Sequence, residues 1–125
     1  MLDHVGLNVS DYERSRDFYA RALAPLGYEM LMEPVPAVCG FGSPKDRKPF
    51  FWISTREAAN QRVHVAFAVD SRELVDAFHE AALAAGGTDN GAPGPREIYH
   101  PNYYGAFVHD PDGNNIEAVC HLPAG

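Results

Sequence analysis

The feature that most restricts the fold of this chain is an internal repeat with a spacing of 60 residues. Residues 3–27 align without gaps with residues 63–87, and nine of the 25 aligned pairs are identical. The identical pairs are His4/His64, Val5/Val65, Val9/Val69, Glu13/Glu73, Phe18/Phe78, Ala22/Ala82, Leu23/Leu83, Ala24/Ala84 and Gly27/Gly87. Such a repeat indicates that one supersecondary unit occurs twice in the chain.

Each copy begins with the pattern of a strand followed by a helix. Apolar residues alternate along residues 2–9 and 63–69, as in strands that are buried on one side. They then recur at helical spacing, to about residue 26 in the first copy and about residue 85 in the second. A capping box and a terminal glycine mark the ends of each helix. The capping boxes are Ser10 with Glu13 and Asp70 with Glu73, and the glycines are Gly27 and Gly86-Gly87.

Short strands follow each helix, so each copy has the order βαβββ. The predicted strands are residues 28–33, 37–41 and 50–55 in the first copy and residues 104–109 and 114–121 in the second. The Gly- and Pro-rich stretch 88–101 predicts only a weak or broken strand. We therefore predict a single α+β domain over residues 1–125, with modules at about 1–57 and 61–125. The two modules form a cupped mixed sheet with the helices on the outside.

Charge and composition exclude several classes of partner. The formal net charge of −7 argues against nucleic acid and anionic membranes. No apolar run approaches the roughly 18 residues of a membrane span. The first residues do not resemble a signal peptide, and Cys39 and Cys120 have no zinc-ribbon or CxxC spacing, so we expect a cytoplasmic protein with reduced thiols. The basic cluster Lys45–Lys48 is interpreted as a solvated loop.

Three residues have the types and positions of metal ligands. His4 and His64 occupy equivalent strand positions and are predicted to point away from the apolar faces. Glu117 alternates with Ile116 and Ala118, which predicts that its carboxylate also points away from the helices. Because an uncompensated carboxylate in mid-strand is costly, two imidazoles and one carboxylate around a divalent ion would stabilise all three groups. The metal can be iron, manganese, nickel, cobalt or zinc.

Each of these residues also has an interpretation without a metal. A mid-strand histidine is often a hydrogen-bonded structural residue. Glu117 could instead pair with an arginine such as Arg96 or Arg56. The coincidence of three such residues on corresponding faces favours the metal site.

The motifs resemble those of the vicinal-oxygen-chelate superfamily, which includes glyoxalase I, fosfomycin-resistance transferases, extradiol dioxygenases and bleomycin-binding proteins. The matching stretches are LDHVGLNV at 2–9, Phe18-Tyr19, VHVAF at 63–67 and DPDGNNIE at 110–117. The resemblance implies paired βαβββ modules around a divalent metal, with His4, His64 and Glu117 as ligands, and it suggests a homodimer. Glyoxalase I has a fourth ligand in a strand that here reads Phe50-Phe51-Trp52-Ile53-Ser54, without an acid. A three-ligand site of the transferase or dioxygenase type is therefore favoured.

The substrate pocket is predicted from polar aromatic residues near this site. His100 and Tyr104 are candidate acid–base groups, since an imidazole titrates near neutrality and a phenol can donate to an oxyanion. Trp52, Tyr103 and His121 are candidate pocket residues. The alternatives are a surface turn for residues 99–104 and core packing for Trp52.

We accordingly expect a small metal-dependent lyase, transferase or dioxygenase that polarises oxygens of a soluble metabolite, with glutathione or another thiol as a possible co-substrate. The alternative is a non-catalytic protein that binds an antibiotic or another small molecule. A structural domain with a vestigial metal site is a third reading. We predict no nucleic-acid or membrane partner.

Overall fold

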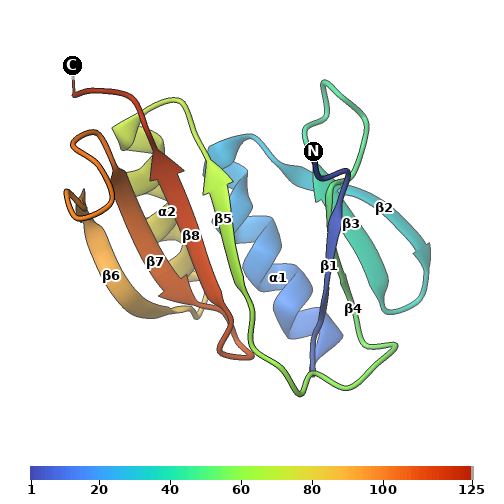
Figure 1. The fold of residues 1–125 in the computed structure, drawn as a ribbon. Helices are drawn as coiled ribbons and strands as arrows, with labels where there is room; N and C mark the ends of the chain where they lie inside the picture. Colours follow the sequence, from blue (N-terminus) through green and yellow to red (C-terminus); the bar gives the residue numbers. More distant parts are fainter. Residues whose placement is uncertain (125) are drawn as a thin grey trace.

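The computed structural model describes residues 1–124 and contains two helices and two four-stranded mixed sheets, an α+β fold of two βαβββ modules (Figure 1). Gly125, the last residue of the predicted second module, lies outside the described residues. The first module comprises β1 (Val5–Asn8), α1 (Tyr12–Leu23), the 3-10 turn η1 (Ala24–Leu26), β2 (Glu29–Val35), β3 (Val38–Gly42) and β4 (Phe51–Ser54). The second comprises β5 (His64–Ala68), α2 (Arg72–Ala84), β6 (Thr88–Pro95), β7 (Tyr104–His109) and β8 (Asn115–Cys120).

The two sheets have the same topology. Their strand orders are β1-β4-β3-β2 and β5-β8-β7-β6, and in each sheet the first strand of the module runs parallel to the last. The second sheet contains a strand, β6, in the stretch where the sequence predicted a weak one. Its pairing with β7 shifts register on either side of Gly91, so the weakness appears as an irregular ladder rather than as a missing strand.

The helix starts differ from the predicted capping boxes by one residue. The caps are Asp11, whose side chain accepts from the Arg14 amide, and Ser71, whose hydroxyl accepts from the Leu74 amide. Ser10 instead donates its backbone N–H to the Asp112 carboxylate, which belongs to the second module. The prediction at Ser10 and Asp70 was therefore wrong. The predicted left-handed glycines are present at the end of η1, with φ 84° at Gly27, and after α2, with φ 102° at Gly86.

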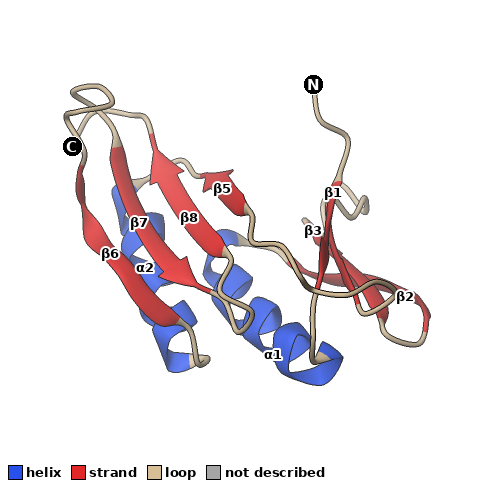
Figure 2. Ribbon diagram, turned by 60° about the horizontal axis from the view of Figure 1, so that its bottom comes forward, coloured by secondary structure: helices blue, strands red, loops and turns tan. Residues whose placement is uncertain are grey.

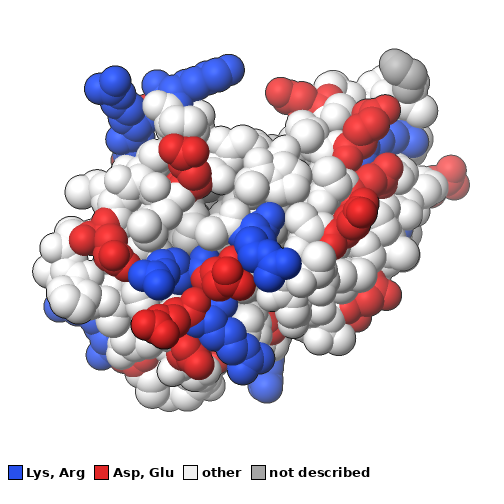
Figure 3. Space-filling view, turned by 180° about the vertical axis from the view of Figure 1, so that it is seen from behind, with Lys and Arg blue, Asp and Glu red and all other residues white. Residues whose placement is uncertain are grey.

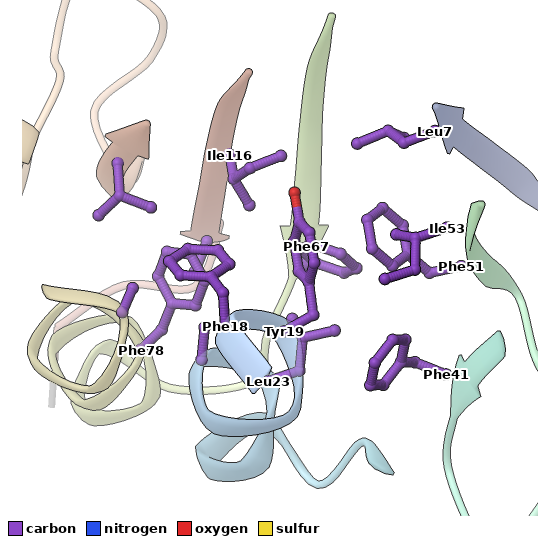
Figure 4. Close-up of a cluster of buried hydrophobic side chains, with 14 of the residues drawn as sticks. Leu7, Phe18, Tyr19, Leu23, Phe41, Phe51, Ile53, Phe67, Phe78 and Ile116 are labelled. Atoms are coloured by element: carbon purple, nitrogen blue, oxygen red, sulfur yellow. The ribbon is translucent and has the colours of Figure 1, made fainter. Parts of the chain in front are cut away.

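One continuous core joins the two modules (Figure 4). Tyr19 of α1 contacts Phe51 of β4, with ring centroids 4.8 Å apart, and Phe51 contacts Phe67 of β5 at 5.4 Å. The buried Tyr19 hydroxyl also donates a hydrogen bond to Asp110, in the turn before β8. The modules are thus fixed to one another by aromatic packing and by a buried hydrogen bond.

The helices lie on one side of the sheets and leave the opposite faces uncovered. Figures 1 and 2 show α2 behind the second sheet and α1 behind and between the two sheets. On the helical side, acidic and basic side chains are interspersed without a continuous basic surface (Figure 3). Within residues 1–124, neither helix is long and apolar enough to cross a membrane.

Candidate functional site

The strand registers place Trp52 and Glu117 at equivalent positions of the two sheets. Gly6 pairs with Trp52 in the first sheet, and Ala66 pairs with Glu117 in the second. Because Gly6 and Ala66 are themselves related by the 60-residue repeat, the indole of one module stands where the other has a carboxylate. Each lies on the sheet face that the helices do not cover, as the alternation predicted for Glu117.

Glu117 is the most deeply buried carboxylate of this face, with 1% of its surface exposed. Its Oε1 accepts a hydrogen bond from His64 Nε2 at 2.8 Å, and its Oε2 accepts one from the Tyr103 hydroxyl. Burial, and then the bond to Glu117, raise the pKa of Tyr103, so its hydroxyl keeps its proton near neutrality. These two donors compensate the carboxylate, whereas an arginine partner was the alternative weighed from sequence.

Gly105 makes room for the contact between Tyr103 and Glu117. A Cβ at this position of β7 would lie 3.2 Å from Glu117 Oε2 and 3.2 Å from the Tyr103 ring. Both contacts are tighter than a side chain ordinarily tolerates, so a larger residue at Gly105 would displace the phenol or the carboxylate.

Two histidines lie beside Tyr103. His100, in the loop before β7, and His121, just after β8, are hydrogen-bonded through Nε2 and Nδ1 at 2.9 Å, with ring centroids 5.1 Å apart. The Tyr103 ring lies edge-on to both, with centroids 5.5 Å from His100 and 5.3 Å from His121. Three of the predicted pocket and acid–base residues, His100, Tyr103 and His121, are thus in contact with one another, and Tyr103 contacts Glu117.

Tyr104 lies on the other face of the sheet. Its hydroxyl donates to Asp76 of α2 at 2.7 Å, and the Arg72 guanidinium lies over its ring. The prediction that Tyr104 is an acid–base group of the pocket was therefore wrong. Tyr103 is the tyrosine that reaches Glu117. Strand alternation did not place Tyr103, because this residue precedes the regular part of β7 and has no strand phase of its own.

His4 lies just before β1, in the other module. Its Nδ1 is 2.7 Å from the Asp3 carboxylate, which also accepts from Lys48, and Lys48 and then His4 lower the pKa of Asp3. His4 lines a groove of about 430 Å³ between the modules, together with Val5, Phe50, Val65 and Phe67. The imidazole is more than half exposed.

Trp52 lies across Gly40 of the neighbouring strand β3. A Cβ at Gly40 would come within 2.8 and 2.9 Å of the indole ring and within 2.7 Å of Pro49. The indole is half-buried and lines a second groove of about 430 Å³ with His4, Asn8 and Arg56. Trp52 is therefore a flat apolar surface on the uncovered face of the first module, as well as a packing element of β3 and β4.

The donor set fits a divalent metal in part. His64 and Glu117 supply one imidazole and one carboxylate in direct contact, which are ligand types that zinc, iron, nickel, cobalt and manganese accept. His4 is not grouped with them. Among residues 1–124, no three His, Cys, Asp or Glu side chains are close enough together to hold an ion. One chain therefore presents two of the three predicted ligands at one place.

The fold and this arrangement define a paired βαβββ protein with a polar site on the uncovered sheet face. A family model, the Glyoxalase/Bleomycin resistance protein/Dioxygenase superfamily, matches residues 1–118. The chain belongs to that superfamily, whose members commonly bind divalent metals and small molecules.

Solved structures show the same fold. A glyoxalase/bleomycin resistance protein from Albidiferax ferrireducens T118 is 34% identical, with a TM-score of 0.80, over 96% of this chain and 98% of that one. A glyoxalase/bleomycin resistance protein/dioxygenase family enzyme from Burkholderia phytofirmans PsJN is 23% identical, with a TM-score of 0.72 and coverages of 96% and 98%. TioX from Micromonospora sp. ML1 is 17% identical, with a TM-score of 0.74 and coverages of 98% and 99%. No curated protein matches the chain.

Proposed function

We propose that this protein is a metal-dependent enzyme that acts on a small oxygenated metabolite at the uncovered face of the second sheet. The observation that carries the proposal is the contact between His64 and the buried Glu117. A buried carboxylate paired with a half-exposed imidazole is two-thirds of a 2-His-1-carboxylate face. A bound divalent ion would supply Lewis-acid stabilisation of negative charge that develops on a substrate oxygen.

The protein's own residues orient this site. Glu117 Oε2 is held by the Tyr103 hydroxyl, which leaves Oε1 directed at His64. Because the Glu117 carboxylate only accepts, His64 Nε2 carries the proton of their hydrogen bond. Ligation through Nε2 therefore requires that proton to leave this nitrogen, either to Nδ1 of the same ring or to solvent, so a metal competes with the hydrogen bond between His64 and Glu117.

We further propose that His4 of a second copy of the chain completes the ligand set. Within one chain, the core contacts of Tyr19, Phe51 and Phe67 fix the first module against the second, and His4 does not join His64 and Glu117. A symmetric dimer would place the first module of one copy against the second module of the other and would form two equivalent sites.

Titration of metal-free protein with Co²⁺, followed by visible absorbance, tests the proposal. We expect binding near one ion per chain, which His64→Ala and Glu117→Gln each abolish. Trp52→Phe is the matched control, because it changes the equivalent position of the other module and leaves the ligands intact. Failure of the wild-type protein to bind Co²⁺, or equal binding by Glu117→Gln, would sink the proposal.

A second candidate function is non-catalytic binding of a flat apolar molecule, and the position of Trp52 over Gly40 favours it. Trp52 is the sole tryptophan of the sequence, so its fluorescence reports directly on this groove. Saturable quenching by planar aromatic ligands in metal-free protein, without any turnover when metal is present, would favour binding over catalysis. Turnover of such a ligand only in the presence of metal would favour the enzyme.

A further inference from the structure

We propose that His100 and His121 form a proton-sensitive clasp that keeps Tyr103 on Glu117. The clasp comprises the Nε2–Nδ1 hydrogen bond between the two imidazoles and a second bond, from the Asn102 backbone N–H to His100 Nδ1 at 3.0 Å. The proposal rests on the proposed role of Glu117 as a metal ligand. In addition, the clasp makes the placement of Tyr103 depend on proton concentration, and Tyr103 in turn orients the Glu117 carboxylate.

The two hydrogen bonds fix the proton positions on both rings. Because His100 Nδ1 accepts from the Asn102 N–H, that nitrogen carries no proton, and a neutral His100 is therefore protonated at Nε2. His100 Nε2 then donates to His121 Nδ1, so His121 carries its own proton at Nε2. Both bonds are made only while each imidazole is neutral.

Uptake of one proton removes at least one of the two hydrogen bonds of the clasp, whichever ring receives it. A proton on His100 Nδ1 faces the Asn102 N–H, donor against donor. A proton on His121 Nδ1 faces the His100 Nε2–H, and moving the latter proton to Nδ1 recreates the first clash. Histidine is the side-chain type that changes charge within the physiological pH range, so proton concentration is the signal to which such a pair responds.

The position of Tyr103 depends on these rings. His100 begins the turn that leads to Tyr103, whose backbone N–H donates to the His100 carbonyl at 3.1 Å. The phenol ring then packs against the edges of both imidazoles and against Tyr99, with ring centroids 4.8 Å apart for the two tyrosines. When the clasp opens, the phenol loses these supports, and its hydroxyl leaves Glu117 Oε2.

The charged groups around the clasp do not substitute for its hydrogen bonds. Glu117 lies on β8 and faces the pair through Tyr103, whereas Arg96, which precedes the loop, bonds the carbonyls of Ala92 and Gly94 and lies over Phe107. Across residues 1–124, neither imidazole forms an ion pair with a carboxylate. An added positive charge on the pair therefore has no carboxylate partner to hold the loop in place.

Nitrogen-15 NMR of the histidine side chains tests the clasp without metal. At pH 8 we expect His100 and His121 both to be the Nε2–H tautomer, and the Asn102 amide to shift as these rings titrate. In His100→Asn, the new Oδ1 still accepts from the Asn102 N–H but takes up no proton, so this amide should stop responding. His79, which pairs with Asp89 elsewhere, is the internal reference. An Nδ1–H tautomer at His100, or an Asn102 amide that does not respond in the wild type, would overturn the proposal.

The consequence for the carboxylate is measured with Co²⁺ in the wild type and in Tyr103→Phe. Loss of an outer hydrogen bond to a metal ligand typically weakens binding 10- to 100-fold. We therefore expect the ratio of the two Kd values for Co²⁺, Tyr103→Phe over wild type, to be about ten at pH 8. The ratio should fall below about twofold at pH 5.5, because the open clasp no longer places the hydroxyl on Glu117. Loss of the phenol's hydrogen bond can only ease protonation of the ligand carboxylate, which would raise the ratio in acid, so a fall in the ratio reports the clasp. A ratio that stays constant contradicts the clasp. If neither protein binds Co²⁺, the proposed function fails, and the tautomers and the Asn102 amide still decide on the clasp.

Discussion

The two modules share a fold but have opposite chemistry on their uncovered faces. In the second module, the buried Glu117 is held by His64 and Tyr103. In the first, the equivalent position holds Trp52, and the equivalent histidine, His4, pairs with the exposed Asp3. Duplication has thus conserved the scaffold, whereas single side chains differ between the modules. The second module orients a carboxylate, and the first presents an imidazole and an apolar surface.

The turns before the last strand of each module differ as well. In the second module, Asp110 accepts from the Asp112 and Asn114 amides, from the Asn114 side chain and from Tyr19. In the first, residues 43–49 form a mostly exposed loop. The Asp110 turn thus joins the second module to the core of the first, and its removal should affect the whole molecule.

The largest effect on stability should come from Tyr19→Phe, which deletes the hydroxyl bound to Asp110. Hydrogen bonds to charged groups are worth about 1.5–3 kcal/mol, and this one is buried, so we expect a loss of that size in the free energy of unfolding. Tyr104→Phe removes a hydroxyl from the exposed Asp76 and should cost less than about 0.5 kcal/mol. Urea denaturation of both variants measures the difference, and equal losses would refute a special role for the Asp110 turn.

The same hydroxyl predicts an alkaline transition. Burial and then Asp110 raise the pKa of Tyr19 well above its usual range. Because the folded pKa exceeds the unfolded one, the contribution is complete below the unfolded value of about 10 and is lost as pH rises further. Above that pH, the wild type should lose unfolding free energy faster than Tyr19→Phe. Parallel decline of the two proteins would contradict this assignment.

The next effect should come from Gly40→Ala, which forces a methyl group against the Trp52 indole and Pro49. Overpacking of this kind costs about 1–3 kcal/mol. Gly6→Ala is the matched control, because its Cβ would meet only the Trp52 Cβ, at 3.9 Å, and should be tolerated. Thermal unfolding distinguishes the two. Similar melting temperatures would show that the indole does not lie on Gly40.

The smallest effect distinguishes the observed helix caps from the predicted ones. Asp11→Ala and Ser71→Ala should each destabilise by about 1 kcal/mol, since each removes a capping acceptor. Asp70→Ala should change stability by less than about 0.5 kcal/mol. A larger loss of stability in Asp70→Ala than in Ser71→Ala would instead support the capping box that the sequence predicted.

The repeat and the strand alternation predicted most of the fold, because both depend on short-range periodicity that a sequence displays directly. They placed His64 and Glu117 on the uncovered face, as the structure has them. The acid–base role was assigned to Tyr104, whereas Tyr103 is the tyrosine that reaches Glu117, because Tyr103 lies in the loop before β7, to which strand alternation does not apply. The repeat and the alternation grouped His4 with His64 and Glu117 at one site, whereas within residues 1–124 of one chain these side chains are not close enough together to hold an ion, since packing between modules has no periodic signal.

The most direct test of a site that is shared between the two modules mixes two variants, each of which lacks one metal ligand. His4→Ala and Glu117→Gln should each bind Co²⁺ poorly. After joint unfolding and refolding, half of randomly formed dimers are mixed, and each mixed dimer has one site with all three ligands, so about one quarter of the wild-type binding capacity should return. A mixture that binds no more Co²⁺ than its separate components would contradict a site built from the first module of one copy and the second module of another.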